Sequence, residues 1–215
     1  MPRPDWDDRY LSGDTPWDSG QPNDHLVEFA RSLPGARKRA IDVGCGTGTN
    51  ALWLARQGFA VLGVDISSIA IDKARAKAAD AGLDCRFQTL DFLHDEIDSG
   101  PFDFVFDLGC LHVFDDAGDR ERFAERVASL LGVDGRWLNL SGSTEGPERE
   151  YGPPRRSTRD LVGAIEPALE IVELRSIELQ ATLPVPVAAW LCVSRPRREP
   201  AQLSTQRDQA ERIVG

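Results

Sequence analysis

The hydrophobic positions of the chain follow two alternating patterns. Short continuous apolar runs, rich in Val, Ile, Leu and Phe, stand at residues 39–43, 59–65, 85–90, 101–107 and 136–140. Runs of this length predict strands that are buried on both faces, as in a parallel sheet. Other segments carry apolar residues three and four positions apart, which predicts helices that pack on the sheet. The alternation of the two patterns predicts an α/β fold.

Polar residues that can cap a helix precede the predicted helices. Asn23 stands before Leu26, Phe29, Ala30 and Leu33, whose spacing places them on one helical face. The other predicted caps are Ser67 or Ser68 for a helix through Ala81, Asp119 for a helix through Leu131, and Ser157, which can form a capping box with Asp160.

Two extended runs close the patterned part of the chain. Residues 169–179 and 185–193 are rich in β-branched residues and are joined at Pro184. Because proline is tolerated at a sheet edge, these runs predict an antiparallel strand pair there. Residues 196–215 are dominated by Arg, Gln, Glu and Pro, which predicts a flexible tail.

The composition fits a globular domain with a small-molecule partner. Of 215 residues, 41% are hydrophobic, and the formal net charge is −10. Nucleic-acid binding relies on Lys and Arg to neutralise phosphates, so this balance argues against a nucleic-acid partner. The chain begins without a basic and apolar leader and lacks the apolar stretch of ~18 residues that a membrane span needs. We therefore expect a cytoplasmic protein without a membrane partner, either a monomer or a homodimer.

The cysteines give no metal-binding signature. Cys45, Cys85, Cys110 and Cys192 lie singly in separate predicted elements, without the spacing of metal ligands. We expect reduced thiols and no metal site.

Residues 39–65 carry the strongest functional signal. Glycines at alternate positions 44, 46 and 48 follow the first strand, and a helix then leads to a second strand that ends at Asp65. Alternate glycines permit a tight turn and a close approach of the backbone to a ligand. An acidic residue about 20 positions further on can accept hydrogen bonds from ribose hydroxyls. The pattern predicts a nucleotide site, with a purely structural glycine-rich turn as the alternative.

Asp42 bears on the kind of nucleotide. A dinucleotide fingerprint reads Gly-x-Gly-x-x-Gly and holds a pyrophosphate, whereas a carboxylate beside the loop suits a cationic ligand end. The string Asp42-Val43-Gly44-Cys45-Gly46-Thr47-Gly48 resembles motif I of the class I S-adenosylmethionine-dependent methyltransferases without a gap.

This resemblance implies a Rossmann-like class I methyltransferase fold over residues 23–195. That fold has a mainly parallel seven-stranded sheet with an antiparallel C-terminal strand pair and helices on both faces. The implied cofactor is S-adenosyl-L-methionine. The residues assigned to it are Asp42, Gly44, Cys45, Gly46 and Gly48, then Asp65 and Ile66, then Asp91 and Phe92, and finally Asp107 and Leu108, each group after a successive predicted strand. An Asp at position 91 is also a common turn former.

Residues 1–22 are rich in Pro, Asp, Gly and aromatic residues, so we expect no long regular element there. Their tryptophans have to bury apolar area against the domain or a ligand. The string from Trp6 and Tyr10 to Pro16-Trp17-Asp18 resembles the N-terminal cover of the thiopurine and thiol S-methyltransferase group, which includes tellurite-resistance methyltransferases. The resemblance implies that Trp6 and Trp17 contact the cofactor, that Trp17 also contacts the substrate, and that Asp18 takes part in catalysis. A surface-packed arm is the alternative.

The segment from Asp107 to His112 follows the fourth strand, where ligands bind in an open parallel sheet. Cys110 and His112 are therefore expected to contact the acceptor. His112 can accept a proton from the nucleophile, or it can satisfy a buried hydrogen bond at the start of a helix. Direct methyl transfer needs no protein nucleophile, so Cys110 is expected to be a small buried side chain.

Residues 141–156 form a long polar run with glycines and prolines after the fifth strand. Loops of this length in compact domains usually serve a function. We expect a substrate lid, with Tyr151 and Arg155 or Arg156 in the pocket.

The acceptor class follows from acid–base chemistry. Methyl transfer from a sulfonium is an in-line displacement in which the protein mainly positions the reactants. A free thiol has a pKa of ~8.5 and supplies thiolate near neutral pH, whereas a phenol with a pKa of ~10 needs a base. The sequence predicts methyl transfer to a small-molecule thiol. The alternatives are O-methylation of a phenol or quinol, with Asp18 or His112 as base, and a non-catalytic cofactor-binding protein.

Overall fold

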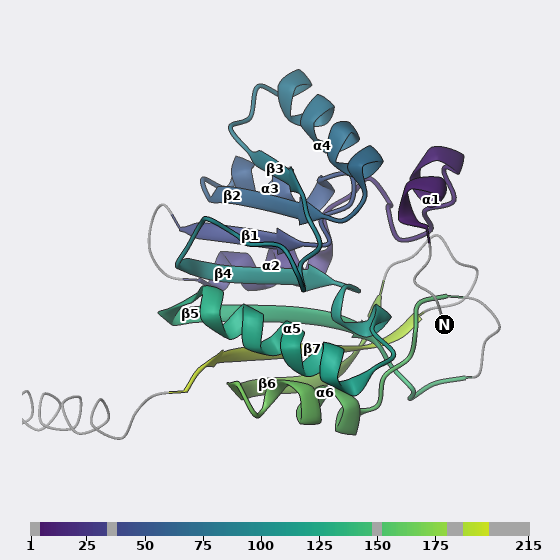
Figure 1. Cartoon of the computed structure of the whole chain (residues 1–215), viewed down its shortest axis with the longest axis vertical. Helices are drawn as coiled ribbons and strands as arrows, with labels where there is room; N and C mark the ends of the chain where they lie inside the picture. Colours follow the sequence, from purple (N-terminus) through teal and green to yellow (C-terminus); the bar gives the residue numbers. More distant parts are fainter. Residues whose placement is uncertain (1–4, 34–37, 148–151, 180–186, 198–215) are drawn as a thin grey trace, which may run out of the picture.

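A seven-stranded sheet organises the computed structural model, which describes residues 5–33, 38–147, 152–179 and 187–197 (Figure 1). The strands are β1 (Arg39–Val43), β2 (Ala60–Asp65), β3 (Arg86–Thr89), β4 (Phe102–Leu108), β5 (Leu131–Gly142), β6 (Leu169–Leu179) and β7 (Val187–Pro196). Their order in the sheet is β3-β2-β1-β4-β5-β7-β6. The first five strands pair in parallel, and β7 runs antiparallel to both β5 and β6. The predicted fold class and the predicted antiparallel pair are confirmed.

Helices cover both faces of this sheet (Figure 1). They are α1 (Trp6–Ser12), α2 (Asp24–Ser32), α3 (Thr49–Arg56), α4 (Ser68–Asp80), α5 (Ala117–Leu130) and α6 (Thr158–Ile165), with a short 3₁₀ turn, η1 (Leu111–Val113). On one face, α2, α3 and α4 share a buried cluster with the sheet, in which Phe29 of α2 packs on Phe104. On the other, α5 and α6 bury residues such as Phe123 against Trp137. Both layers leave the carboxyl ends of the parallel strands accessible to ligands.

Most predicted helix caps are confirmed. Asn23 and Ser67 cap α2 and α4 through their side chains, and Ser157 forms the predicted capping box with α6. The predicted cap at Asp119 is wrong, because the side chain of Asp116 accepts the amide of Asp119 at 3.1 Å and starts α5. The helix ends at Leu130 because Leu131 already has extended backbone and pairs with β4.

The N-terminal segment contains a helix that the sequence pattern did not predict. Asp5 caps α1 through a hydrogen bond from the amide of Asp8, and Gly13 ends the helix with a φ of 76°. Two aspartates in the first turn favour this helix through its dipole. The helix lies beside the N-terminal end of α4 (Figure 1).

Some expectations lie outside the described residues, namely those for Tyr151 and for residues 198–215 of the tail. All four cysteines are described and none forms a disulfide. No described helix is both long and apolar enough to cross a membrane. Within the same ranges, no group of three or more His, Cys, Asp or Glu residues could hold a metal ion.

Candidate active site

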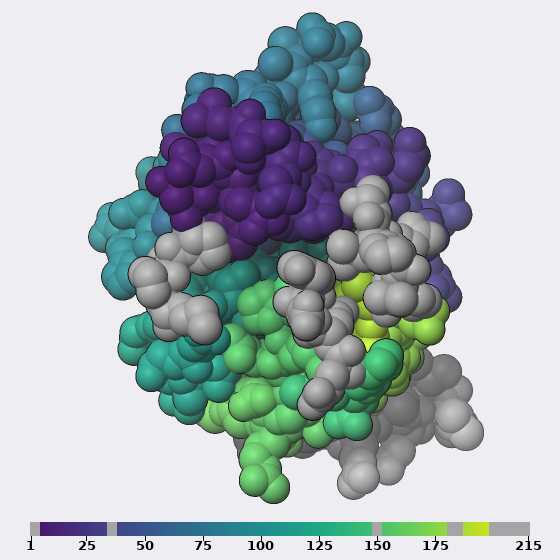
Figure 2. Space-filling view, turned by 90° about the vertical axis from the view of Figure 1, so that its right-hand side faces the viewer, coloured from purple at the N-terminus to yellow at the C-terminus, as the bar shows by residue number. Residues whose placement is uncertain are grey.

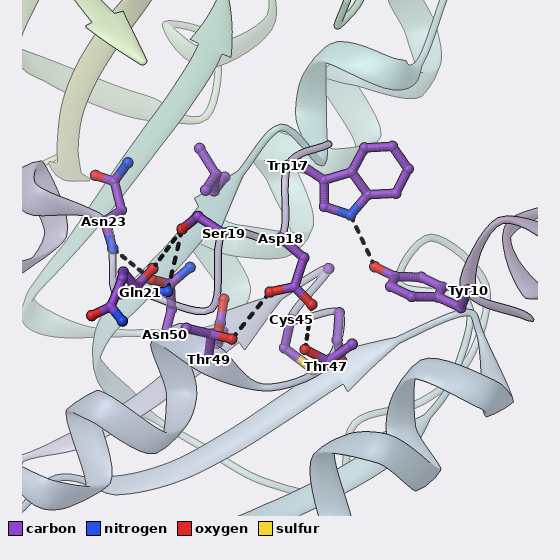
Figure 3. Close-up of a pocket in the computed structure, with 14 residues that line it drawn as sticks. Tyr10, Trp17, Asp18, Ser19, Gln21, Asn23, Cys45, Thr47, Thr49 and Asn50 are labelled. Atoms are coloured by element: carbon purple, nitrogen blue, oxygen red, sulfur yellow. Dashed lines mark hydrogen bonds between the residues drawn. The ribbon is translucent and has the colours of Figure 1, made fainter. Parts of the chain in front are cut away.

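A cleft lies between the N-terminal segment and the carboxyl ends of β1 and β4 (Figure 3). We call residues 5–22 the cover and residues 44–48 the glycine loop. The cleft is lined by Tyr10, Trp17, Asp18, Ser19 and Gln21 of the cover, by Asn23, and by Asp42, Gly44, Cys45, Gly46, Thr47, Thr49, Asn50 and Leu108. In the space-filling view, the cover is the purple region on the face where the strands end (Figure 2). The structure thus brings the cover and the glycine loop together.

The glycine loop requires glycine for its conformation and for its contacts. Gly44, Gly46 and Gly48 have φ values of 69°, 53° and 81°, which residues with a Cβ rarely adopt. A Cβ at Gly46 would lie 2.7 Å from the hydroxyl oxygen of Tyr10. The glycine loop therefore packs closely against Tyr10 of the cover, with no room for a side chain at Gly46.

Asp65 holds the loop against the end of β2. Its Oδ2 accepts the amide of Gly46 at 2.8 Å, and its Oδ1 accepts the amide of Ser67 at 2.9 Å. Burial raises the pKa of this carboxyl, which is only 8% exposed. Ile66, the next residue, is 43% exposed and does not line the cleft.

Asp42 is a buried carboxylate with an unused oxygen. Asp42 is only 2% exposed to solvent, and its Oδ2 has no hydrogen-bond partner among the described residues. Burial, followed by the charges of Asp65 and Asp107, raises the pKa of Asp42 to about 8. A buried polar atom without a partner costs free energy, and a cationic ligand group would offset that cost. This carboxylate and the glycine loop fit the amino-acid end of S-adenosylmethionine.

Asp18 fastens the cover to the glycine loop. Its Oδ2 accepts the hydroxyl of Thr47 at 2.5 Å, and its Oδ1 accepts the hydroxyl of Thr49 at 3.2 Å (Figure 3). Lys77 of α4 donates to the same Thr47 hydroxyl oxygen. Because both carboxylate oxygens serve this junction, the structure favours a fastening role for Asp18 over the base expected from the sequence.

A second junction joins α1 to α4. Asp7 accepts hydrogen bonds from the hydroxyls of Ser67 and Ser68. These bonds lower the pKa of Asp7, with the Ser67 hydroxyl making the largest contribution. Lys73 donates to the main-chain carbonyl of Tyr10. Both ends of α1 are therefore bound to residues that follow β2, through Asp7 at its N-terminal end and through Tyr10 at its C-terminal end.

The aromatic residues of the cover pack on one another. The ring centroids of Trp6 and Trp17 lie 5.7 Å apart in an edge arrangement. The indole N–H of Trp17 donates to the hydroxyl of Tyr10 at 3.3 Å (Figure 3). Tyr10 is 4% exposed and lines the cleft, whereas Trp6 does not. Sequence reasoning assigned no role to Tyr10, although its spacing of four from Trp6 would place both on one helical face.

Replacing Asp18 by Ala is expected to loosen the cover. The change removes the bonds to Thr47 and Thr49, so limited proteolysis within the cover should be several-fold faster. S-adenosylmethionine should bind about 5- to 10-fold more weakly, as for the loss of one or two charge-assisted hydrogen bonds. Asp8→Ala, at an exposed position of α1, is the matched control and should resemble the unmodified protein. Equal proteolysis of the two variants would contradict the fastening role.

Asp91 and Phe92 lie away from the cleft lining. Phe92 is buried in the core, with its ring centroid 4.6 Å from that of Phe123. Asp91 accepts the amide of Leu93 at 2.9 Å and lies 3.1 Å from Nδ1 of His94. The side chain of Phe92 packs in the core, and Asp91 makes the local hydrogen bonds of a turn former, so their assignment to the cofactor stays a prediction.

Asp107 organises the segment after β4. This fully buried carboxylate accepts the indole N–H of Trp137 at 2.8 Å and the amide N–H of Asn139 at 2.9 Å. It also accepts the backbone amides of Cys110 and Leu111, each at 3.1 Å. Burial raises its pKa to about 6, although these hydrogen bonds oppose the shift. The side chain of Asp107 thus shapes the loop that faces the glycine loop.

That loop positions Cys110 and His112. The Cβ and Sγ of Cys110 lie 3.1 and 3.2 Å from the point where a Cβ on Gly44 would stand. His112 is 5% exposed, and its Nδ1 accepts the backbone N–H of Gly142 at 2.8 Å. Of the two sequence-based alternatives, the structure supports the buried hydrogen bond.

The arginines after β5 bind groups outside the cleft lining. Arg155 donates from Nε to the carbonyl of Ser143 at 2.9 Å and from its terminal nitrogen to that of Gly146 at 3.0 Å. Arg156 donates to the carboxylate of Asp115 at 2.8 Å. Neither arginine lines the cleft, so the expectation that Arg155 binds substrate finds no support in its contacts.

Comparisons with known proteins identify the domain family and the fold. Residues 40–135 match the methyltransferase domain family. The probable thiol methyltransferase 2 of Arabidopsis thaliana is 34% identical over 154 residues, which cover 69% of this chain. The matched region spans only 65% of the length of that relative.

Solved structures share the fold. One, from work on the conversion of a disulfide bond into a thioacetal group during echinomycin biosynthesis, has a TM-score of 0.74 and 26% identity, with 98% of this chain and 91% of that chain covered. A TehB-like S-adenosylmethionine-dependent methyltransferase from Corynebacterium glutamicum has a TM-score of 0.61 at 22% identity, over 89% of this chain and 94% of that chain. Together with the seven-stranded sheet, the glycine loop and Asp65 at the end of β2, these matches show that the chain contains a methyltransferase domain with the class I S-adenosylmethionine-dependent methyltransferase fold.

Proposed function

We propose that the protein transfers the methyl group of S-adenosylmethionine to the sulfur of a small-molecule thiol. The observation that carries cofactor binding is the unpartnered Oδ2 of Asp42, buried beside a loop of left-handed glycines. In this proposal Asp42 binds the cofactor ammonium, and Asp65 binds the ribose hydroxyls. The cofactor supplies an electrophilic methyl group on a sulfonium.

The residues of the cleft would act mainly by positioning. The glycine loop and the cover would hold the methyl group in line with an acceptor that enters beside Cys110. The acceptor thiolate would form a bond to the methyl carbon while the bond from that carbon to the sulfonium sulfur breaks and its electron pair remains on that sulfur. Alignment of this kind can lower the activation barrier of a two-reactant step by ~7–11 kcal/mol.

A thiol acceptor suits the acid–base groups of the site. The chain has three histidines, and each already has a described neighbour: His25 the carbonyl of Glu178, His94 the carboxylate of Asp91, and His112 the amide of Gly142. Asp18 is bound to two threonine hydroxyls. Because a thiol ionises without a strong base near neutral pH, it needs none of these groups as a proton acceptor.

Two similarities support sulfur chemistry. The Arabidopsis relative is named as a probable thiol methyltransferase, and the structure at 26% identity comes from work on the conversion of a disulfide bond. A shared fold does not fix the acceptor by itself, so the proposal needs a direct test. The competing acceptors are a phenol or quinol hydroxyl.

The test is an acceptor panel with S-adenosylmethionine that carries an isotopic label in its methyl group. Purified protein is mixed with alkyl thiols, aryl thiols, phenols and quinols, and mass spectrometry identifies each labelled product. We expect labelled thioethers, with an initial rate that rises with the thiolate fraction of the acceptor. Labelled ethers without thioethers would overturn the thiol proposal, and cofactor binding without transfer to any member would favour a non-catalytic role.

A further inference from the structure

The charged side chains that line the cleft are both acidic. Asp18 and Asp42 belong to the lining, and within the described ranges no lysine, arginine or histidine does. Asp42 is buried, and its Oδ2 has no described partner. Other polar side chains of the lining are neutral hydroxyls and amides, such as those of Ser19 and Gln21 (Figure 3). An anion in this cleft would therefore lie near two carboxylates and find no cation in the described lining.

Cations that contact the cover or the glycine loop are engaged outside the lining. Arg9 bridges Asp14, with its Nε 3.0 Å from a carboxylate oxygen. Lys73 donates to a main-chain carbonyl of the cover. Lys77 donates to the threonine hydroxyl that also binds Asp18, so it offsets part of the charge of that aspartate. These three side chains hold the cover in place, and none of them lines the cleft.

The cover adds negative charge around the cleft. Residues 5–22 contain five aspartates and one arginine. Asp5, Asp8 and Asp14 are exposed to solvent, and the cover lies on the face where the parallel strands end (Figure 2). Clefts lined by one sign of charge focus the field of those charges, because their protein walls have a low dielectric constant. The approach to the cleft is therefore favourable for cations and unfavourable for anions.

S-adenosylmethionine changes this balance only near its methyl group. In the function proposed above, Asp42 pairs with the ammonium of the cofactor. The cofactor carboxylate then adds a negative charge, and the sulfonium adds a positive charge next to the methyl group that is transferred. A thiolate sulfur in line with that methyl group faces the sulfonium. Any other anionic group of the acceptor lies in surroundings that are dominated by carboxylates.

We propose that this site selects its acceptor by charge. It accepts small thiols that are neutral or cationic apart from the reacting sulfur, and it disfavours thiols that carry a carboxylate or a phosphate. This selectivity rests on the thiol methyltransferase function proposed above. Discrimination of this kind comes from repulsion and from the lack of a pairing cation for the disfavoured acceptor. Asp18, Asp42 and the aspartates of the cover supply the repulsion.

The first test compares three benzenethiols that differ in their 4-substituent: a carboxylate, its neutral carboxamide, and a cationic aminomethyl group. The kcat/KM of each thiol at pH 7.5 is divided by its thiolate fraction. At low salt we expect the carboxylate to react about 10- to 30-fold more slowly than the carboxamide, as for like charges ~8–10 Å apart at an effective dielectric constant of ~20. The aminomethyl thiol should react at least as fast as the carboxamide.

Salt should reduce this difference. Between about 20 mM and about 300 mM salt, screening should narrow the difference between carboxylate and carboxamide to about threefold or less. A carboxylate that reacts as fast as the carboxamide at low salt would overturn the proposed selectivity. A difference that does not change with salt would indicate a steric cause and would overturn it as well.

The second test places a cation in the cleft. Gln21 lines the cleft and is exposed, so Gln21→Lys adds a positive charge there. Gln57→Lys adds the same charge outside the lining, at an exposed position after α3. We expect the ratio of carboxamide to carboxylate kcat/KM to fall at least about fivefold in Gln21→Lys and to stay within about twofold in Gln57→Lys. A general loss of activity cancels in this ratio. An unchanged ratio in Gln21→Lys would contradict selection within the cleft.

The third test needs no methyl transfer and separates the charge of the cleft from the proposed function. Near neutral pH, S-adenosylmethionine carries one net positive charge, and S-adenosylhomocysteine carries none. Calorimetry measures the dissociation constants of both at about 20 mM and about 300 mM salt. We expect added salt to weaken S-adenosylmethionine binding several-fold more than S-adenosylhomocysteine binding. Equal salt dependence would refute an acidic cleft. Labelled ethers without thioethers would refute the thiol function and leave this measurement valid.

Discussion

Replacing Asp42 by Asn is expected to weaken the binding of S-adenosylmethionine by about 30-fold or more. The change keeps the shape of the side chain and removes the charge that would pair with the cofactor ammonium. Loss of one partner from a buried charge pair typically costs ~2–5 kcal/mol. Isothermal titration measures the dissociation constant, with Asp80→Asn at an exposed position of α4 as control. Unchanged binding in Asp42→Asn would remove the main support for the cofactor site.

The same carboxyl predicts opposite effects of pH on stability and on binding. Its pKa is raised from 3.8 to about 8 in the folded protein, so its stabilising contribution is complete below pH 4 and is lost as the pH rises through 8. The Asp42→Asn variant has no ionisable group at this position, so it does not lose stability in this way as the pH rises. At pH 9, without ligand, the variant should exceed the unmodified protein in free energy of unfolding by an amount on the order of a few kcal/mol.

Cofactor binding requires the ionised form of Asp42 and should therefore release a proton near neutral pH. The affinity of the unmodified protein should rise between pH 6 and pH 7.5, a range in which an α-amino group with a pKa of ~8 stays largely charged. Calorimetry in buffers with different ionisation enthalpies measures the number of protons released. In Asp42→Asn we expect both the pH dependence and the proton release to disappear. Proton uptake by the unmodified protein would contradict the assignment.

Gly46→Ala is expected to cause the second large loss. The new Cβ would lie 2.7 Å from the Tyr10 hydroxyl, at a φ of 53°. Tyr10 would have to move, and its bond to Trp17 would move the cover with it. Cofactor affinity should fall at least about tenfold, and the free energy of unfolding should fall by about 1–3 kcal/mol. Calorimetry and chemical denaturation measure the two effects.

Gly82→Ala separates backbone strain from the contact with Tyr10. Gly82 has a φ of 62° and nothing within 4 Å of its Cβ position, so it should lose about 1–2 kcal/mol of stability and bind the cofactor normally. Adding Tyr10→Phe to Gly46→Ala removes the clashing hydroxyl and should restore part of the affinity. If Gly46→Ala and Gly82→Ala behaved alike, close packing of the cover on the glycine loop would be refuted.

The parts of this structure that could be predicted from sequence depend on local chemistry. The buried parallel strands follow from short apolar runs, and the caps at Asn23, Ser67 and Ser157 from side chains that reach their own helix. The glycine loop was found because its φ values restrict the residue type. The prediction of a cap at Asp119 was wrong because Asp116, three residues earlier, offers the same chemistry and starts α5.

The rest depends on partners that are distant in sequence. Asp107 is held by Asn139 and His112 by Gly142, pairs separated by 32 and 30 residues. No local pattern shows that the carboxylate of Asp107 faces the sheet interior or that Phe92 packs on Phe123. The contact between Tyr10 and Gly46 likewise exists only after the cover folds back.

The most direct test of the account is a competition for the methyl group. Equal concentrations of an aryl thiol and the phenol with the same ring are mixed with the protein and labelled S-adenosylmethionine at pH 7.5, and the two methylated products are quantified. We expect the labelled thioether to dominate, because the thiol is more ionised than the phenol at this pH and needs no base. A labelled ether as the main product would contradict the proposed acceptor.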